Sequence, residues 1–156
     1  MHPITEIVYN YDYAKRLYRG EGNFEDVWRN IVGRGADFET VFNEYIGVIL
    51  DLIEKFTGFA WEEFADLSMP IYLIEGGESF CHPLSLVVSD DPRAMLEDCI
   101  YQLAHRNMYF GFVSDGEQAG WFTDVTAHVL EDLGVEKPAR HAHDLRVASV
   151  KHYLKR

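Results

Sequence analysis

The strongest periodic signal in the chain runs over residues 38–56, where apolar side chains recur at the three- and four-residue spacing of an α-helix. Asp37 stands just before this stretch as a candidate cap, and Gly58 follows it as a terminator. The shorter stretch 24–32 has the same spacing and is followed by Gly33. The sequence therefore predicts two successive helices that are separated between Gly33 and Asp37.

Two short apolar runs indicate strands. Ile71–Ile74 is a compact apolar run that Gly76 and Gly77 terminate, and Leu84–Val88 alternates apolar and other residues before a turn. The segment 5–11 is rich in β-branched and aromatic residues, which favours a third strand, although its apolar residues also fit helical spacing. We therefore expect a small sheet of two or three strands.

The second half of the chain predicts further helices. Asp91, followed by a proline, is typical of a helix start. Another helix is expected from Thr123 or Asp124 to Gly134, and a last one after Pro138. The helix that starts at Asp91 carries a predicted buried stripe of Leu96, Cys99, Ile100 and Leu103.

Length and composition fit a single helix-rich α+β domain over residues 1–156, in which the strands pack against the longest helices. With 47% hydrophobic residues the chain can bury a core of ordinary size, which excludes intrinsic disorder. We find no apolar run of membrane-spanning length and no signal peptide, so we expect no membrane association and a cytoplasmic protein. Cys81 and Cys99 are expected to be free thiols there.

Charge is unevenly distributed along the chain. The formal net charge is −12, which argues against general nucleic-acid binding because that affinity rests on Lys and Arg. Residues 67–136 hold 12 acidic and 2 basic residues, whereas residues 137–156 hold 1 acidic and 6 basic residues. We expect the basic end to dock onto the acidic middle through Val147, Val150 and Leu154, with a free basic tail as the alternative. A small molecule or a basic peptide is the expected external partner, and the oligomeric state stays open.

Residues 101–105 read Tyr-Gln-Leu-Ala-His inside a predicted helix. This segment resembles the His-Glu-x-x-His helix of the zincin metallopeptidases, with Tyr101 in place of the first histidine and Gln102 in place of the glutamate. Strand Leu84–Val88 precedes the helix as the substrate-lining edge strand does in zincins. A second helix follows, where that fold supplies a third metal ligand. The resemblance covers about residues 70–133.

The resemblance implies a zincin-like fold whose peptidase chemistry is lost. Gln102 has no titratable group near neutral pH to act as general base, and Tyr101 is a phenol there. We therefore expect a catalytically inactive protein that uses its cleft to bind a ligand or peptide. The expected cleft residues are Tyr101, Gln102, His105 and Trp121. Alternatively, Trp121 and Phe122 are ordinary residues of the hydrophobic core.

A metal site is a further expectation from the same region. Zinc takes about four N, S or O ligands in a tetrahedral arrangement. The candidate ligands are His105, His128, Asp124 and Glu131. The alternative is structural: Asp124 caps its helix and His128 is a half-buried histidine.

Two other functions stay open at this stage. The first is an unrelated acidic protein-interaction module that binds a basic partner, and the second is a metal-dependent hydrolase with an unusual ligand set. Cys81 and His82 could also form a nucleophilic pair, but adjacent residues of an extended segment point in opposite directions. We favour a core position for Cys99 and loop packing for Cys81.

Overall fold

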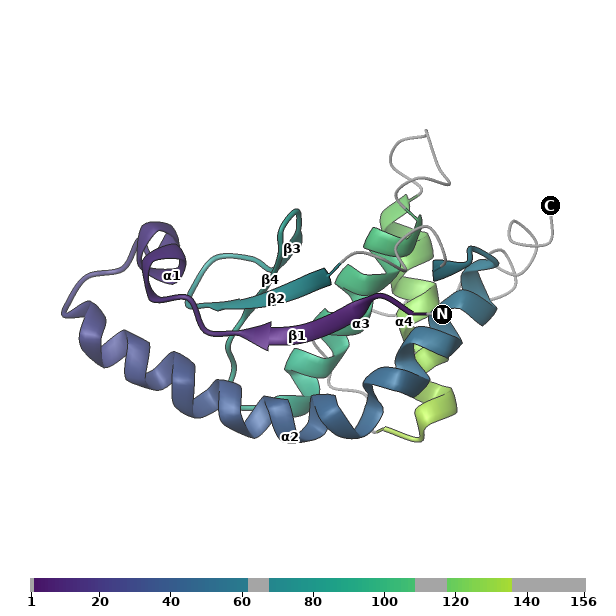
Figure 1. The fold of residues 1–156 in the computed structure, drawn as a ribbon, viewed down its shortest axis with the longest axis horizontal. Coiled ribbons are helices and arrows are strands. Elements are labelled where there is room, and N and C mark those ends of the chain that lie inside the picture. The colour runs from purple at the N-terminus through teal and green to yellow at the C-terminus, as the bar shows by residue number, and fades with distance from the viewer. Residues whose placement is uncertain (1, 62–67, 109–117, 136–156) are drawn as a thin grey trace.

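The computed structural model describes residues 2–61, 68–108 and 118–135. Within them the chain forms a helix-rich α+β fold, as the sequence predicts, with four strands instead of two or three (Figure 1). The helix predicted after Pro138 and the basic end lie outside the described residues. The elements are β1 (Ile4–Val8), α1 (Tyr11–Leu17), α2 (Phe24–Thr57), β2 (Ser68–Ile74), β3 (Phe80–Cys81), β4 (Leu84–Val87), α3 (Pro92–Met108) and α4 (Gln118–Leu133).

The four strands form one mixed sheet in the order β1-β2-β4-β3. The first three strands are parallel, and β3 pairs antiparallel with β4 at the edge. Leu73 pairs with Leu86, and both side chains belong to the buried core, to which α2, α3 and α4 contribute. The alternate residues Tyr72 and Ser85 lie on the other face, where Tyr13 of α1 contacts both of them. The sheet therefore has helices on both faces.

Helix α2 is one continuous helix, so the predicted break between Gly33 and Asp37 is wrong. Ile31 and Phe38 are both fully buried, and the apolar stripe continues through the glycine-containing turn. At Gly35 an added Cβ would lie 2.5 Å from Leu73 Cδ1, so this glycine permits close contact between the helix and the sheet. Packing along the whole stripe outweighs the cost of about 1 kcal/mol for a glycine in a helix interior. Asp37 is consequently an exposed residue inside the helix rather than a cap.

The α3 prediction is confirmed in detail, whereas the predicted start of α4 is wrong. Asp91 caps α3 by accepting a hydrogen bond from the Arg93 backbone N–H at 3.0 Å, and the four residues of the predicted stripe are fully buried. Helix α4 begins at Gln118, ahead of the predicted start. Asp124 therefore lies inside the helix, 2% exposed, and does not cap it. The helix ends before Gly134, whose φ of 68° suits a terminating glycine.

Helix α1 and strand β3 have no counterpart in the sequence predictions. The predicted strand over residues 5–11 ends at Val8, because Asn10 caps the seven-residue helix α1. The two-residue strand β3 is too short to show a periodic pattern. No helix in the described part of the chain combines the length and apolarity that crossing a membrane requires.

Candidate functional site

Strand β3 and helix α3 meet at the edge of the sheet. Gln102 Nε2 donates a hydrogen bond of 3.2 Å to the backbone carbonyl of Ser79, just before β3. One helical turn further on, His105 Nδ1 lies 3.3 Å from Cys81 Sγ. Two of the predicted cleft residues therefore contact the edge segment directly. Cys81 lies in this strand beside a histidine, so the predicted loop packing of Cys81 is wrong.

The His105 ring is held between two elements. It stacks on Phe122 of α4 at a centroid distance of 4.4 Å, while its Nδ1 faces Cys81 on β3. Burial, and to a lesser extent the nearby His82, lowers the pKa of His105 below its usual 6.5. The imidazole is therefore uncharged at neutral pH, a state in which it can accept a proton.

Tyr101 completes this group from the same helix face. Its half-buried ring packs edge-on against Phe122 at 5.8 Å. Burial, followed by the neighbouring Cys81, raises the pKa of Tyr101 above its usual 10. The side chain is therefore a neutral phenol at physiological pH. The remaining predicted cleft residue, Trp121, is partly buried against the core, and its neighbour Phe122 is the α4 residue in contact with both Tyr101 and His105.

Ser79 fixes the segment that leads into β3. Its Oγ accepts a hydrogen bond from the Val87 backbone N–H at 3.0 Å and contacts the buried carboxylate of Asp98 at 3.3 Å. Its carbonyl accepts from Gln102. One serine thus joins β4 and α3 to the edge segment. Sequence reasoning missed this role because nothing near Ser79 in the chain indicates these distant partners.

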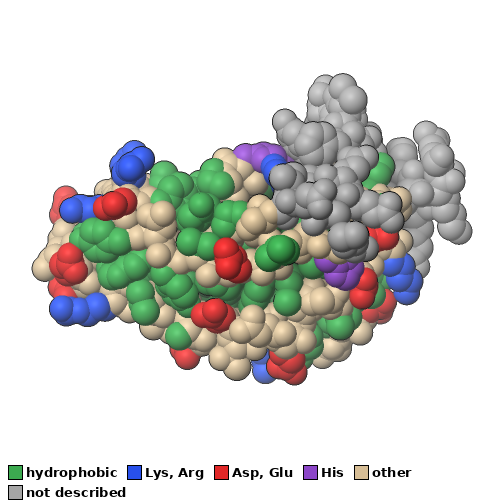
Figure 2. All heavy atoms as spheres, in the orientation of Figure 1, with side chains coloured by type: hydrophobic (Ala, Val, Ile, Leu, Met, Phe, Trp, Pro, Cys, Tyr) green, Lys and Arg blue, Asp and Glu red, His purple; other side chains and the backbone are tan. Residues whose placement is uncertain are grey.

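A pocket of about 320 Å³ opens at the end of β3. Arg106 Nη1 donates a hydrogen bond of 2.6 Å to His82 Nδ1 at its wall. The described lining consists of Ser68, Met69, Pro70, Cys81, His82, Pro83, Leu84 and Arg106. This lining carries a guanidinium and no carboxylate, in contrast to the acidic average of the surrounding chain. On the face shown in Figure 2 the acidic side chains are scattered among hydrophobic ones rather than gathered in one patch.

The four predicted metal ligands do not form a common site. His128 stacks on Phe56 of α2 at 5.0 Å, whereas His105 faces Cys81 and Phe122. Glu131 is exposed. Among the described residues no three His, Cys, Asp or Glu side chains are placed to hold a metal ion. These donors therefore do not fit the zinc site that the zincin resemblance implies, and metal content stays a question for direct measurement.

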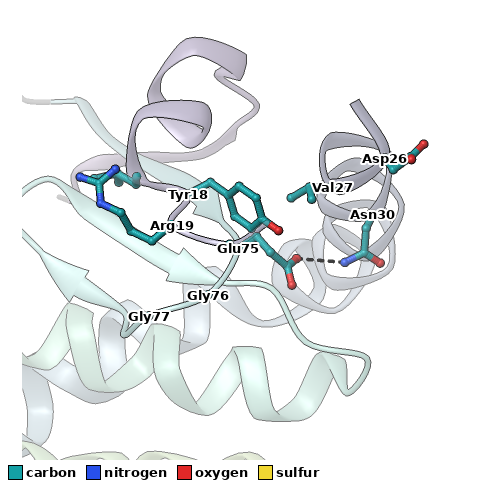
Figure 3. A pocket seen from close by; sticks show the side chains of 10 residues that line it. Tyr18, Arg19, Asp26, Val27, Asn30, Glu75, Gly76 and Gly77 are labelled. Atoms are coloured by element: carbon teal, nitrogen blue, oxygen red, sulfur yellow. Dashed lines mark hydrogen bonds between the residues drawn. The ribbon is translucent and has the colours of Figure 1, made fainter. Parts of the chain in front are cut away.

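A second and larger pocket, of about 520 Å³, lies between the α1–α2 connection and the turn after β2. Asn30 Nδ2 donates a hydrogen bond of 2.9 Å to Glu75, which ties α2 to this turn (Figure 3). Tyr18 and Glu75 point into the same space, while Arg19 points away from the Asn30–Glu75 pair. Asp26 adds a second carboxylate to the lining. This pocket is acidic and aromatic in character, and none of the predicted cleft residues lines it.

Comparison with known proteins adds no family to this picture. No protein-family model, curated protein or solved structure matches the chain. The zincin resemblance therefore rests on residues 101–105 and their neighbours, and local geometry is the basis for assigning a function.

Proposed function

We propose that the protein is a zincin-like binding protein without peptidase activity, and that it binds the C-terminal end of a basic peptide along β3. The observation that carries this proposal is the contact of α3 with the edge segment through Gln102 and His105. In the zincin frame Gln102 occupies the position of the general base. Its amide donates to the Ser79 carbonyl and has no site that could take a proton from water.

Strand β3 offers the peptide an edge to pair with. It is the last strand in the sheet order, so its outer side pairs with no strand among the described residues. An extended peptide can add to such an edge through main-chain hydrogen bonds, and neighbouring pockets then select its side chains. The contacts of Ser79 and Cys81 with α3 hold this edge in place before the peptide arrives.

The pocket at the end of β3 supports recognition of a carboxylate. Arg106 is a fork of donors that suits a carboxylate group, and it lines the pocket beside Cys81. The net charge of −12 favours the approach of basic peptides over a longer range. A peptide that is basic along its length and ends in a free carboxylate satisfies both conditions. Two free thiols fit the cytoplasmic location that we propose for the protein.

Peptide display with free C-termini tests this proposal. Random octapeptides are fused by their N-termini to a carrier, and the enriched sequences are synthesised as free acids and as C-terminal amides. We expect enriched peptides to be basic and to lose about 10- to 100-fold in affinity on amidation, since a hydrogen bond to a charged group contributes about 1.5–3 kcal/mol.

Arg106→Gln and Arg29→Gln form a matched pair for the same assay. Arg106 lines the pocket, whereas Arg29 is an exposed residue of α2 in a surface ion pair. We expect the Arg106 variant to bind the acid and the amide equally, and the Arg29 variant to retain the wild-type preference. Failure to enrich any peptide, or an unchanged preference in the Arg106 variant, contradicts the proposal.

A second candidate function is capture of a basic protein side chain at the larger pocket. Glu75 provides a carboxylate beside the ring of Tyr18, a combination that favours ammonium or guanidinium groups. Glu75→Gln should then weaken binding of an enriched basic peptide, and added salt should release it because exposed charges are screened. Binding that depends on Arg106 and not on Glu75 excludes this candidate.

A further inference from the structure

Cys81 and Cys99 are the two cysteines of the chain, and the fold places them in different surroundings. Cys99 is fully buried on α3, inside the apolar stripe of that helix. Cys81 is 5% exposed, but it lies on β3, lines the 320 Å³ pocket and has its Sγ 3.3 Å from His105 Nδ1. A thiol beside an imidazole is the arrangement in which a base can activate a nucleophile.

Neighbouring groups support this function of the pair. The His105 ring stacks on Phe122, which fixes the plane of the ring, and its Nδ1 lies against the sulfur. Burial raises the pKa of the Cys81 thiol, while the Arg106 guanidinium opposes this shift. Burial also lowers the pKa of His105. The resting pair is therefore a neutral thiol and a neutral imidazole, which corresponds to general-base activation rather than a preformed ion pair.

We propose that Cys81 is an acyl-accepting nucleophile with His105 as its general base, and that the pocket takes an ester or thioester whose acyl part carries a carboxylate. The Cys81 proton passes to His105 Nδ1 while Sγ forms a bond to the carbonyl carbon. The bond from that carbon to the ester oxygen or thioester sulfur then breaks, and the leaving group takes the proton from His105. The products are S-acyl-Cys81 and a free alcohol or thiol, with no change of oxidation state.

Arg106 gives this site its substrate class. It lines the same pocket as Cys81, so the guanidinium can bind the carboxylate of an acyl group while Cys81 meets its reacting carbonyl. The inference goes beyond peptide binding and does not depend on it, because a small ester needs no strand pairing. If the protein binds no peptide, acylation of Cys81 can still be measured, and if Cys81 is not acylated, peptide binding can still be measured.

Acylation by p-nitrophenyl esters tests the proposal on the full-length protein. The protein is treated with p-nitrophenyl acetate and with the p-nitrophenyl monoester of glutaric acid, and the acylated residues are mapped by mass spectrometry. We expect one acyl group per chain at Cys81, none at Cys99, and faster reaction with the glutaric ester. Because Cys99 is compared within the same molecule, this result requires no variant. Acylation of lysines without Cys81 overturns the proposal.

Three variants locate the chemistry. His105→Gln should lower the rate at Cys81 by about 10²-fold, the lower end of the range for general-base catalysis. Arg106→Gln should reduce the ratio of glutaric to acetic ester rates by about tenfold, as expected for loss of one charge-assisted hydrogen bond. Cys99→Ala should react like the wild type. Circular dichroism confirms that each variant is folded, and His105→Asn replaces His105→Gln if the latter does not fold. An unchanged rate in the folded His105 variant, or an unchanged ester ratio in the Arg106 variant, overturns the proposal.

Discussion

Helices α2 and α3 contact the sheet in different ways. Helix α2 contributes fully buried apolar groups such as Phe38 to the core and approaches β2 closely where Gly35 meets Leu73. Helix α3 meets β3 through polar groups, with Gln102 on the Ser79 carbonyl and His105 on Cys81. The first contact layer provides stability without chemistry. The second holds polar groups in fixed positions at an edge of the sheet, which is where a binding function is best supported.

The largest expected loss of stability comes from a substitution in the apolar core. Phe38→Ala removes a fully buried ring that also packs on Phe42, so it leaves a cavity in the core. We expect a loss of about 3–5 kcal/mol in the free energy of unfolding. Urea denaturation measures it. A loss comparable to that of an exposed-site substitution contradicts the assignment of this layer to the core.

Gly35→Ala and Gly33→Ala separate close packing from helix propensity. A Cβ at Gly35 meets Leu73 and Tyr9, and we expect a destabilisation of about 1–3 kcal/mol from overpacking. A Cβ at Gly33 meets nothing within 4 Å, and alanine there should stabilise α2 by about 0.5–1 kcal/mol. Thermal melting of both variants checks the pair. If both variants shift the melting temperature in the same direction, the result contradicts a continuous α2 that packs on the sheet.

Gln102→Ala tests the polar contact between α3 and the segment that leads into β3. It leaves the Ser79 carbonyl without this donor, so we expect a loss of about 1–2 kcal/mol in the free energy of unfolding. Asn43→Ala on the exposed side of α2 is the control and should stay within about 0.5 kcal/mol of wild type. If both variants are equally stable in chemical denaturation, the hydrogen bond does not hold the edge.

The pH dependence of stability gives a smaller and more specific effect. Folding lowers the pKa of His105, so the neutral imidazole is favoured in the folded state. This contribution is fully present above the unfolded-state pKa near 6.5 and is lost as the pH falls through that value towards the folded pKa. His105→Gln should therefore lose less stability than wild type between about pH 7.5 and about pH 5. Parallel stability profiles contradict this role of burial at His105.

Metal removal is expected to have the smallest effect. His105 faces Cys81 and Phe122 whereas His128 stacks on Phe56, so these two candidate ligands face different partners and we expect a chelator to leave the melting temperature unchanged. Elemental analysis of the purified protein should give less than about a tenth of an equivalent of zinc, against the full equivalent of an occupied structural site. One equivalent of bound zinc contradicts this expectation.

Local patterns predicted the helices well where the deciding residues are close in sequence. The stripe of α3, its Asp91 cap and the end of α2 at Gly58 depend on neighbours within a turn or two. The false break in α2 arose because Gly33 and Asp37 have the residue types of a helix end and a helix cap. The continuity of α2 depends instead on the packing of residues such as Ile31 and Phe38 in the core. In the site, residues 101–105 were predicted correctly as a helix segment, but their partners on β3 were not.

The contacts between residues 101–105 and β3 were not predicted for one physical reason. Cys81 and His105 are 24 residues apart in the chain, and a two-residue strand brings them together. Neither periodicity nor composition reports such a contact. The proline-flanked Cys81-His82 pair was a visible signal, and it would have indicated the site had the sheet order been known.

The most direct test of peptide binding at β3 compares the two edges of the sheet by NMR. The tightest peptide from the display experiment is titrated into isotope-labelled protein, and backbone amide shifts are followed at β3 and at β1, the opposite edge. We predict the largest shifts at Phe80, Cys81 and Arg106, and little change over Ile4–Val8, where the exposed Glu6 places a charge on the edge. Largest shifts on β1, or shifts confined to the lining of the pocket at Glu75, would contradict peptide binding at β3.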